Sequence, residues 1–166
     1  MNAKSQLPCI GNSPVLFLDL DGVMSVGPEA KSDSFCVTHS CATALKRIVE
    51  QVPGLAVVVT DENRADASKM SRLTSFLRSF GVPSEVIADV TPQVEAAPDA
   101  PAPQRADEIR AWLSKHSEVR SHVTLDDNYV AYASGAGFSR VLYVDPAVGL
   151  DDRIAAEAVR ILHAYK

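Results

Sequence analysis

The chain has 166 residues, a length that suits one well-buried domain spanning 1–166 and is too short for two ordinary ones. Hydrophobic residues make up 46% and charged residues 22%, as in folded domains, and no apolar run is long enough for a membrane helix, so we expect a soluble, cytoplasmic protein without a membrane partner. The net charge of −5 gives no broad basic surface for nucleic acid, which is therefore not favoured as a partner, although a local basic patch would still permit it.

Short apolar runs alternate with longer amphipathic segments, which is typical of a parallel sheet covered by helices. In chain order, the pattern predicts a strand over 15–20, a helix over 41–52, a strand over 55–60, a helix over 70–80, a short strand over 85–89, a helix over 109–116, strands over 122–125 and 140–144, and a helix over 154–165 that Asp151 caps. We therefore expect a three-layer, Rossmann-like α/β domain with a mostly parallel sheet of about five strands.

Two longer segments, 22–37 and 91–104, have no such periodicity. The first contains Gly27 followed by proline and predicts a small hairpin or an irregular flap. The second is rich in proline and alanine, which predicts a surface loop that would suit a partial lid. Neither segment has room for a substantial cap domain. We expect the packed core to run over about 15–165, after an N-terminal extension over 1–13.

Acidic and hydroxyl side chains follow three of the predicted strands. In an open parallel sheet, ligands bind beyond the carboxyl ends of the strands, so side chains at these positions are expected to converge. They are Asp19 and Asp21 after the first strand, Thr60 and Asp61 after the second, and Asp126 and Asp127 after the fourth. Each acid taken alone is better explained as a solvated loop residue or a helix cap, but together they favour a functional acidic site.

The surroundings of Asp19 support this interpretation. It lies between two leucines in the run VLFLDLDGV, where a carboxylate without a partner is costly. Several carboxylates stay ionised at close range only when a cation joins them, and oxygen ligands near a phosphate suit Mg²⁺. Gly22 allows the chain to leave the strand tightly and lets backbone amides approach an anion. The sequence thus predicts a magnesium-dependent phosphoryl-transfer site.

The run LFLDLDGV resembles the first motif, DxDG, of the haloacid-dehalogenase-like (HAD) superfamily. Thr60 is similar to its second motif, Arg105 to the cation of its third, and Asp126 with Asp127 to its fourth. The later run VLYVDPAVGLD resembles the tail of a small bacterial subgroup of capless domains in this superfamily. The resemblance extends from about residue 15 to residue 162.

The resemblance implies a Mg²⁺-dependent phosphomonoester hydrolase with defined residue roles. Asp19 would be the nucleophile that forms an aspartyl-phosphate, and Asp21 would be the general acid and base. Thr60 and Arg105 would complete the catalytic set by binding the transferred phosphoryl group. Mg²⁺ would be held by Asp19, the Asp21 carbonyl, Asp126 and Asp127, and substrate contacts are expected from Gly22, Thr60, Asp61, Arg64 and Arg105.

The second motif departs from the pattern of this subgroup. Where related chains often have Ser-Ser-Trp-Arg, this one has Thr60, Asp61, Glu62 and an asparagine before Arg64. The two added acids place negative charge near the phosphate, which leaves open a non-catalytic phosphate- or metal-binding regulatory domain. A phosphorelay receiver fits less well, because its paired acids would follow the first strand. A capless site implies an open crevice for a large phosphorylated substrate, or one closed by a partner subunit, so an oligomer is possible.

Overall fold

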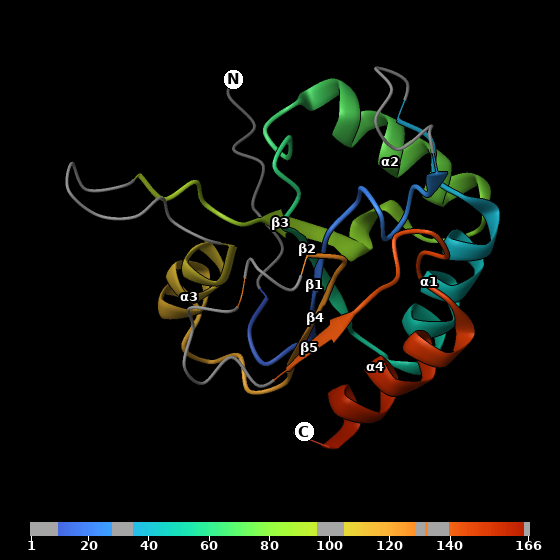
Figure 1. The fold of residues 1–166 in the computed structure, drawn as a ribbon. Coiled ribbons are helices and arrows are strands. Elements are labelled where there is room, and N and C mark those ends of the chain that lie inside the picture. The colour runs from blue at the N-terminus through green and yellow to red at the C-terminus, as the bar shows by residue number, and fades with distance from the viewer. Residues whose placement is uncertain (1–9, 28–34, 96–104, 129–131, 133–139, 165–166) are drawn as a thin grey trace, which may run out of the picture.

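The computed structural model describes residues 10–27, 35–95, 105–128, 132 and 140–164 (Figure 1). Within these ranges the chain alternates between strands and helices. The elements in order are β1 (Val15–Leu18), α1 (His39–Gln51), β2 (Ala56–Val59), α2 (Ala67–Ser79), β3 (Ile87–Val90), α3 (Arg105–Lys115), β4 (His122–Asp126), β5 (Val141–Tyr143) and α4 (Asp152–Ala164). Most of the predicted proline-rich loop and part of the predicted flap lie outside the described residues.

The five strands form one sheet in the order β3-β2-β1-β4-β5, and every pairing is parallel. The predicted α/β fold class is therefore confirmed. Each predicted strand is present. The strands β1, β2 and β5 are shorter than predicted at one or both ends, β4 continues to Asp126, and β3 is shifted toward the C-terminus and ends at Val90. The third strand begins at Ile87 instead of Glu85, because the preceding Ser84–Val86 forms a turn of 3₁₀ helix. Sequence periodicity alone does not separate such a turn from the strand that follows it.

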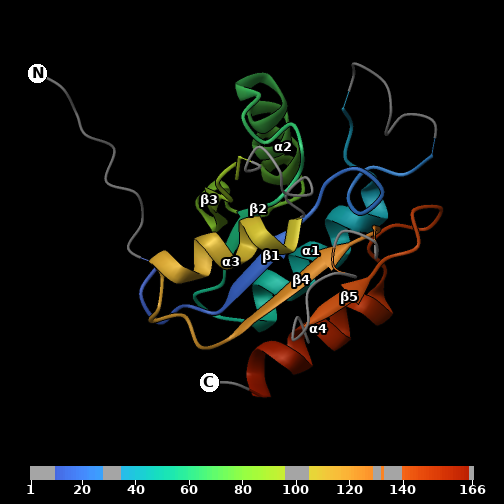
Figure 2. The same ribbon diagram turned by 60° about the vertical axis from the view of Figure 1, so that its left-hand side comes forward.

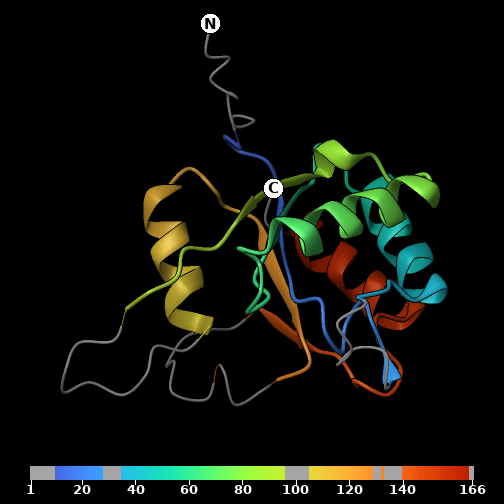
Figure 3. The same ribbon diagram turned by 90° about the horizontal axis from the view of Figure 1, so that it is seen from above.

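Helices cover both faces of the sheet, as Figure 3 shows from above. Of the described helices, α3 lies on one face, and α1, α2 and α4 lie on the other, where α1 and α4 pack side by side (Figures 1 and 2). Alternate residues of β1 point to opposite faces of the sheet. Because helices cover both faces, all four residues are buried. The predicted three layers are thus present, with unequal numbers of helices on the two sides.

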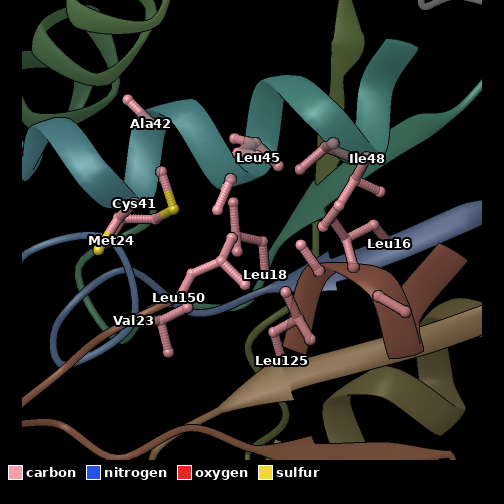
Figure 4. Packing of buried hydrophobic residues seen from close by; sticks show 14 of the residues in the cluster. Leu16, Leu18, Val23, Met24, Cys41, Ala42, Leu45, Ile48, Leu125 and Leu150 are labelled. Atoms are coloured by element: carbon pink, nitrogen blue, oxygen red, sulfur yellow. The ribbon is translucent and has the colours of Figure 1, made fainter. Parts of the chain in front are cut away.

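The larger core lies between the sheet and helices α1, α2 and α4. Leu45 and Ile48 of α1 lie over Leu16 and Leu18 of β1 (Figure 4), and all four side chains are fully buried. Because these residues bury the apolar face of the amphipathic helix α1 against the central strand, they hold the end of β1 in place. The position of the residues after Leu18 therefore depends on this core.

A second core lies beneath α3. Trp112 packs edge-on against Phe17 with ring centroids 5.3 Å apart, and its indole N–H donates to Asp89 on β3 over 2.7 Å. Ile10 is also buried in this cluster, although the sequence placed it in an extension before the core. Packed structure therefore begins at least as early as Ile10, while residues 1–9 lie outside the described part. This packing fixes α3, whose first residue reaches the candidate site.

None of the helices in the described residues is long and apolar enough to cross a membrane. The final helix begins as predicted, since the Asp151 carboxylate accepts a hydrogen bond from the Ile154 amide over 2.8 Å. The cytoplasmic location stays a prediction.

Candidate active site

The strand order places two acidic segments side by side at the carboxyl edge of the sheet. The chain moves outward from β1 in both directions, through β2 to β3 and through β4 to β5, so the order reverses between β1 and β4. Leu18 of β1 pairs with Leu125 of β4, and the Asp19 amide donates to the Leu125 carbonyl over 3.1 Å. Asp19 and Asp126 are therefore level with each other at this switch point.

Arg105, the first residue of α3, bridges these two acids. Its Nη1 lies 2.5 Å from Asp19 Oδ1 and 2.9 Å from Asp126 Oδ2. Burial by itself would lower the pKa of Arg105. The attraction of the Asp19 and Asp126 carboxylates outweighs the effect of burial and raises this pKa above its usual value. The structure thus brings together three residues whose outermost members, Asp19 and Asp126, are more than a hundred positions apart in the sequence, and it keeps a permanent positive charge between two acids.

Asp126 is completely buried and held by further hydrogen bonds. The Tyr132 hydroxyl donates to its Oδ2 over 2.7 Å, and the Asn128 amide donates to its Oδ1 over 2.8 Å. Sequence analysis missed Tyr132, which lies in a stretch with neither periodicity nor a motif. Its hydroxyl fixes the orientation of the Asp126 carboxylate, as residues behind metal ligands commonly do.

Three carboxylates form a cluster that fits a divalent cation. One oxygen each of Asp19, Asp126 and Asp127 lies within 4.8 Å of the others. Burial raises the pKa of Asp19 to about 8; Arg105 opposes this rise, and the Asp126 carboxylate adds to it. Burial also raises the pKa of Asp127. The ionised form of Asp19 is therefore disfavoured in the protein alone, and an added cation would restore it.

Thr60 lies at the end of β2, beside the end of β1. Its amide donates to the Leu18 carbonyl over 2.9 Å, and the residue is fully buried. None of the described residues offers its Oγ1 a hydrogen bond. A buried hydroxyl without a protein partner is uncommon, and a ligand oxygen would satisfy it.

Asp61 is buried rather than exposed, and it is paired with a lysine that sequence analysis missed. Lys69 Nζ lies 2.9 Å from Asp61 Oδ1 and 3.0 Å from Asp21 Oδ2. Burial alone would lower the pKa of Lys69, but its bonds to Asp61 and Asp21 raise it, so the ammonium stays charged. The negative charge that Asp61 was expected to add to the site is therefore offset.

A signal for Lys69 was present in the sequence. Lys69, Leu73 and Leu77 are spaced four apart and form the buried face of α2. The sequence predicted that this helix begins at Met70, whereas it begins at Ala67 after Asp66, whose carboxylate caps the first turn. With the correct helix start, a lysine in line with the apolar face would have been noticed.

An open cleft of about 820 Å³ lies over these groups. The acids Asp19, Asp21 and Asp127 line it together with Arg105 and Lys69. Phe35 adds an aromatic wall, and Lys69 Nζ lies 5.1 Å from the centre of its ring. The cleft therefore combines acids, cations and one apolar surface, a mixture suited to a phosphorylated ligand with a metal ion.

Residues 15–155 match a family described as the HAD domain in Swiss Army Knife RNA repair proteins. The chain belongs to this family of HAD domains. Among solved structures, the HAD domain of the effector protein Lem4 from Legionella pneumophila is similar, with a TM-score of 0.55 and 12% identity over 92% of this chain and 96% of that one. At this identity the likeness shows the fold alone. The search of curated proteins found no match.

The resemblance to the HAD superfamily that LFLDLDGV carries is confirmed, and the described residues include no large cap. Five of the residues that resemble its motifs meet at one edge of the sheet in this HAD domain: Asp19, Thr60, Arg105, Asp126 and Asp127. Asp21 is next to them, with its side chain 41% exposed in the cleft. Their catalytic roles stay predictions.

Arg64, which the sequence suggested as a substrate contact, makes its hydrogen bonds and its ion pair within this HAD domain. Its Nε donates to the Thr91 carbonyl over 2.7 Å, its Nη1 donates to the Asp61 carbonyl over 2.9 Å, and its Nη2 pairs with Glu108 over 2.6 Å. The side chain is only 4% exposed. We therefore assign Arg64 a structural role, since a guanidinium used in this way has little left for a ligand.

Gly22 brings the chain close to Asp127. It has a φ of +81°, and a Cβ at this position would collide with the Asp127 carboxylate. Its amide donates to the Ser25 carbonyl over 2.8 Å, so the predicted tight turn is present but this N–H is already used. The glycine leaves the space that the third acid of the cluster occupies.

We expect Gly22→Ala to displace Asp127 and to weaken the binding of divalent cations, measured by calorimetry with Mg²⁺. The matched control is Gly54→Ala, which has a φ of +77° but open space around its Cβ, so it carries only the backbone cost of about 1 kcal/mol. Equal cation affinities in the two variants would show that the contact with Asp127 does not matter.

Proposed function

We propose that this HAD domain is a Mg²⁺-dependent phosphomonoester hydrolase that works through an aspartyl-phosphate intermediate. The observation that carries the proposal is the arrangement around Asp19. This carboxylate lies at the switch point of the sheet, 2.5 Å from Arg105 and within 4.8 Å of two further acids, and Thr60 at the adjacent strand end has an unused hydroxyl. A nucleophile, a cation and a free donor side by side are what phosphoryl transfer needs.

Mg²⁺ fits the oxygen-only cluster of acids. Asp19, Asp126 and Asp127 would hold it, together with the Asp21 carbonyl that the family resemblance implies. When bound, the ion offsets the negative charge of the carboxylates and of the phosphoryl oxygens.

The residues of the chain would divide the reaction between them. An Asp19 oxygen attacks phosphorus, the bond between phosphorus and the ester oxygen breaks, and Asp21 gives its proton to the departing oxygen. Water then attacks the aspartyl-phosphate, Asp21 takes a proton from that water, and phosphate leaves with Asp19 restored. Thr60 donates a hydrogen bond to a phosphoryl oxygen, and Arg105 offsets the charge that develops there.

The direct test is release of inorganic phosphate from an aryl phosphate, with Mg²⁺ and with a chelator in its place. Phosphorylated RNA ends belong in the same assay, since the matching family is described from RNA repair proteins, beside nucleotides, sugar phosphates and phosphopeptides. We expect turnover only when Mg²⁺ is present. No turnover of any ester under either condition would refute the proposal.

Binding of Mg²⁺ should also stabilise the fold. At a Mg²⁺ concentration a hundred times the dissociation constant, the free energy of unfolding should rise by about 2.7 kcal/mol, which thermal unfolding can measure. Asp126→Asn should remove most of this gain, whereas Asp107→Asn on the outer side of α3 should keep it. An equal gain in both variants would show that the ion binds elsewhere.

The alternative of a non-catalytic regulatory domain is less well supported by the structure. It was suggested by the added charge of Asp61 and Glu62, and Lys69 offsets the charge of Asp61. Binding of both Mg²⁺ and a beryllium fluoride mimic of phosphate, without turnover of any ester, would favour this alternative.

A further inference from the structure

We propose that Lys69 is a positioning residue, which holds the Asp21 carboxylate in place at the cleft for the proton transfers that the proposed function assigns to Asp21. The inference rests on the proposed function and deepens it, because neither the motifs nor the family match assigns a role to this lysine. It concerns only residues that the structure describes.

The first support is the direct contact between Lys69 and Asp21. Lys69 Nζ donates to Asp21 Oδ2 over 3.0 Å, whereas Asp21 Oδ1 is buried and has no hydrogen-bond partner among the described residues. An ammonium group can only donate, so Oδ2 must remain an acceptor. The lysine therefore fixes the orientation of this carboxylate through its contact with Oδ2.

The second support is that Lys69 is itself held. Its Nζ also donates to Asp61 Oδ1 over 2.9 Å, and the same oxygen accepts the Asn63 amide over 2.8 Å. Asp61 is only 2% exposed and lies two residues after Val59, the last residue of β2. Phe35, with its ring centre 5.1 Å from Nζ, lies against the ammonium as well.

Together these contacts link the ends of two strands through one cation. Asp21, whose side chain is 41% exposed, would otherwise be free to rotate in the open cleft. Lys69, with a side chain only 10% exposed, gives it a fixed partner. Because general acid catalysis depends on the distance and direction of proton transfer, loss of this partner should slow the steps that need a proton from Asp21.

The test uses two esters that differ in their need for a proton. Phenyl phosphate has a poor leaving group, which depends on protonation, whereas dinitrophenolate departs from dinitrophenyl phosphate without a proton. In Lys69→Met, which keeps the stem and removes the charge, we expect kcat to fall about 100-fold on phenyl phosphate and less than about 3-fold on the dinitrophenyl ester. The KM of both esters should change little.

Two further variants complete the design. Lys69→Arg keeps the charge and should recover part of kcat on phenyl phosphate, and Lys46→Met on the exposed side of α1 should leave both esters unaffected. If Lys69→Met does not fold, Asp61→Asn takes its place, because it weakens the contact that holds the lysine. In this variant kcat should again fall more on phenyl phosphate than on the dinitrophenyl ester, but by a smaller factor.

Equal losses on the two esters in wild-type-like folded variants would overturn the positioning role and leave the proposed function intact. A wild-type protein that hydrolyses neither these two esters nor any other ester of the phosphate-release assay would overturn both the proposed function and the role of Lys69 in it. The two failures are therefore distinct.

Discussion

Asp19→Asn is expected to lower kcat for phosphate release by about 10⁴-fold or more, because the amide cannot form the aspartyl-phosphate. The measurement is single-turnover release of phosphate from an aryl phosphate at saturating Mg²⁺, with denatured protein analysed for a phosphorylated aspartate. Wild-type protein should show the covalent intermediate, and the variant should not.

The loss should not come from unfolding. Burial raises the pKa of Asp19 to about 8, which means that the fold disfavours the ionised carboxylate at neutral pH. A neutral amide of the same size should therefore leave the thermal midpoint in a chelator close to that of the wild type. Asp107→Asn, on the exposed side of α3, is the matched control and should keep full activity. Full activity in Asp19→Asn would exclude it as the nucleophile.

Arg64→Met is expected to lower the free energy of unfolding by about 3 kcal/mol or more, because it removes a buried guanidinium and leaves a carboxylate that is only 16% exposed without its partner. Glu108 would lose the 2.6 Å ion pair, and the carbonyls of Thr91 and Pro92 would lose donors at 2.7 and 2.9 Å. Urea unfolding followed by circular dichroism measures the loss.

The same variant separates a structural role from substrate binding. Where Arg64→Met is still folded, we expect an unchanged KM, since the guanidinium makes its contacts within the protein. Arg47→Met is the control: its pair with Asp152 is exposed and should contribute less than about 1 kcal/mol. A raised KM with little loss of stability would return Arg64 to the substrate contacts.

The positions of the acidic and hydroxyl side chains at the strand ends could be predicted from the sequence. Local patterns placed Asp19, Asp21, Asp126 and Asp127 correctly at strand ends. These patterns are the DxDG run, the apolar strand before it and the paired acids at the end of the fourth apolar run. Thr60 was found in the same way, because it ends an apolar run. These residues could be predicted because a parallel sheet brings the carboxyl ends of its strands to one edge.

The partners of these residues were less predictable. Arg64 was expected in the cleft and instead pairs with Glu108, which is 44 positions away. Asp61 was expected to add charge, yet Lys69 offsets that charge from the next helix. In both cases a long side chain reaches a group that no spacing rule connects to it.

Local patterns predicted the succession of strands and helices along the chain, because each pattern depends on neighbours a few positions apart. From this alternation followed a mostly parallel sheet and an acidic edge. The direction in which a buried cation points depends instead on which acids and carbonyls the packed helices leave within reach. Packing alone therefore gave Arg64 a structural role, brought Tyr132 to Asp126 and placed Lys69 between Asp21 and Asp61.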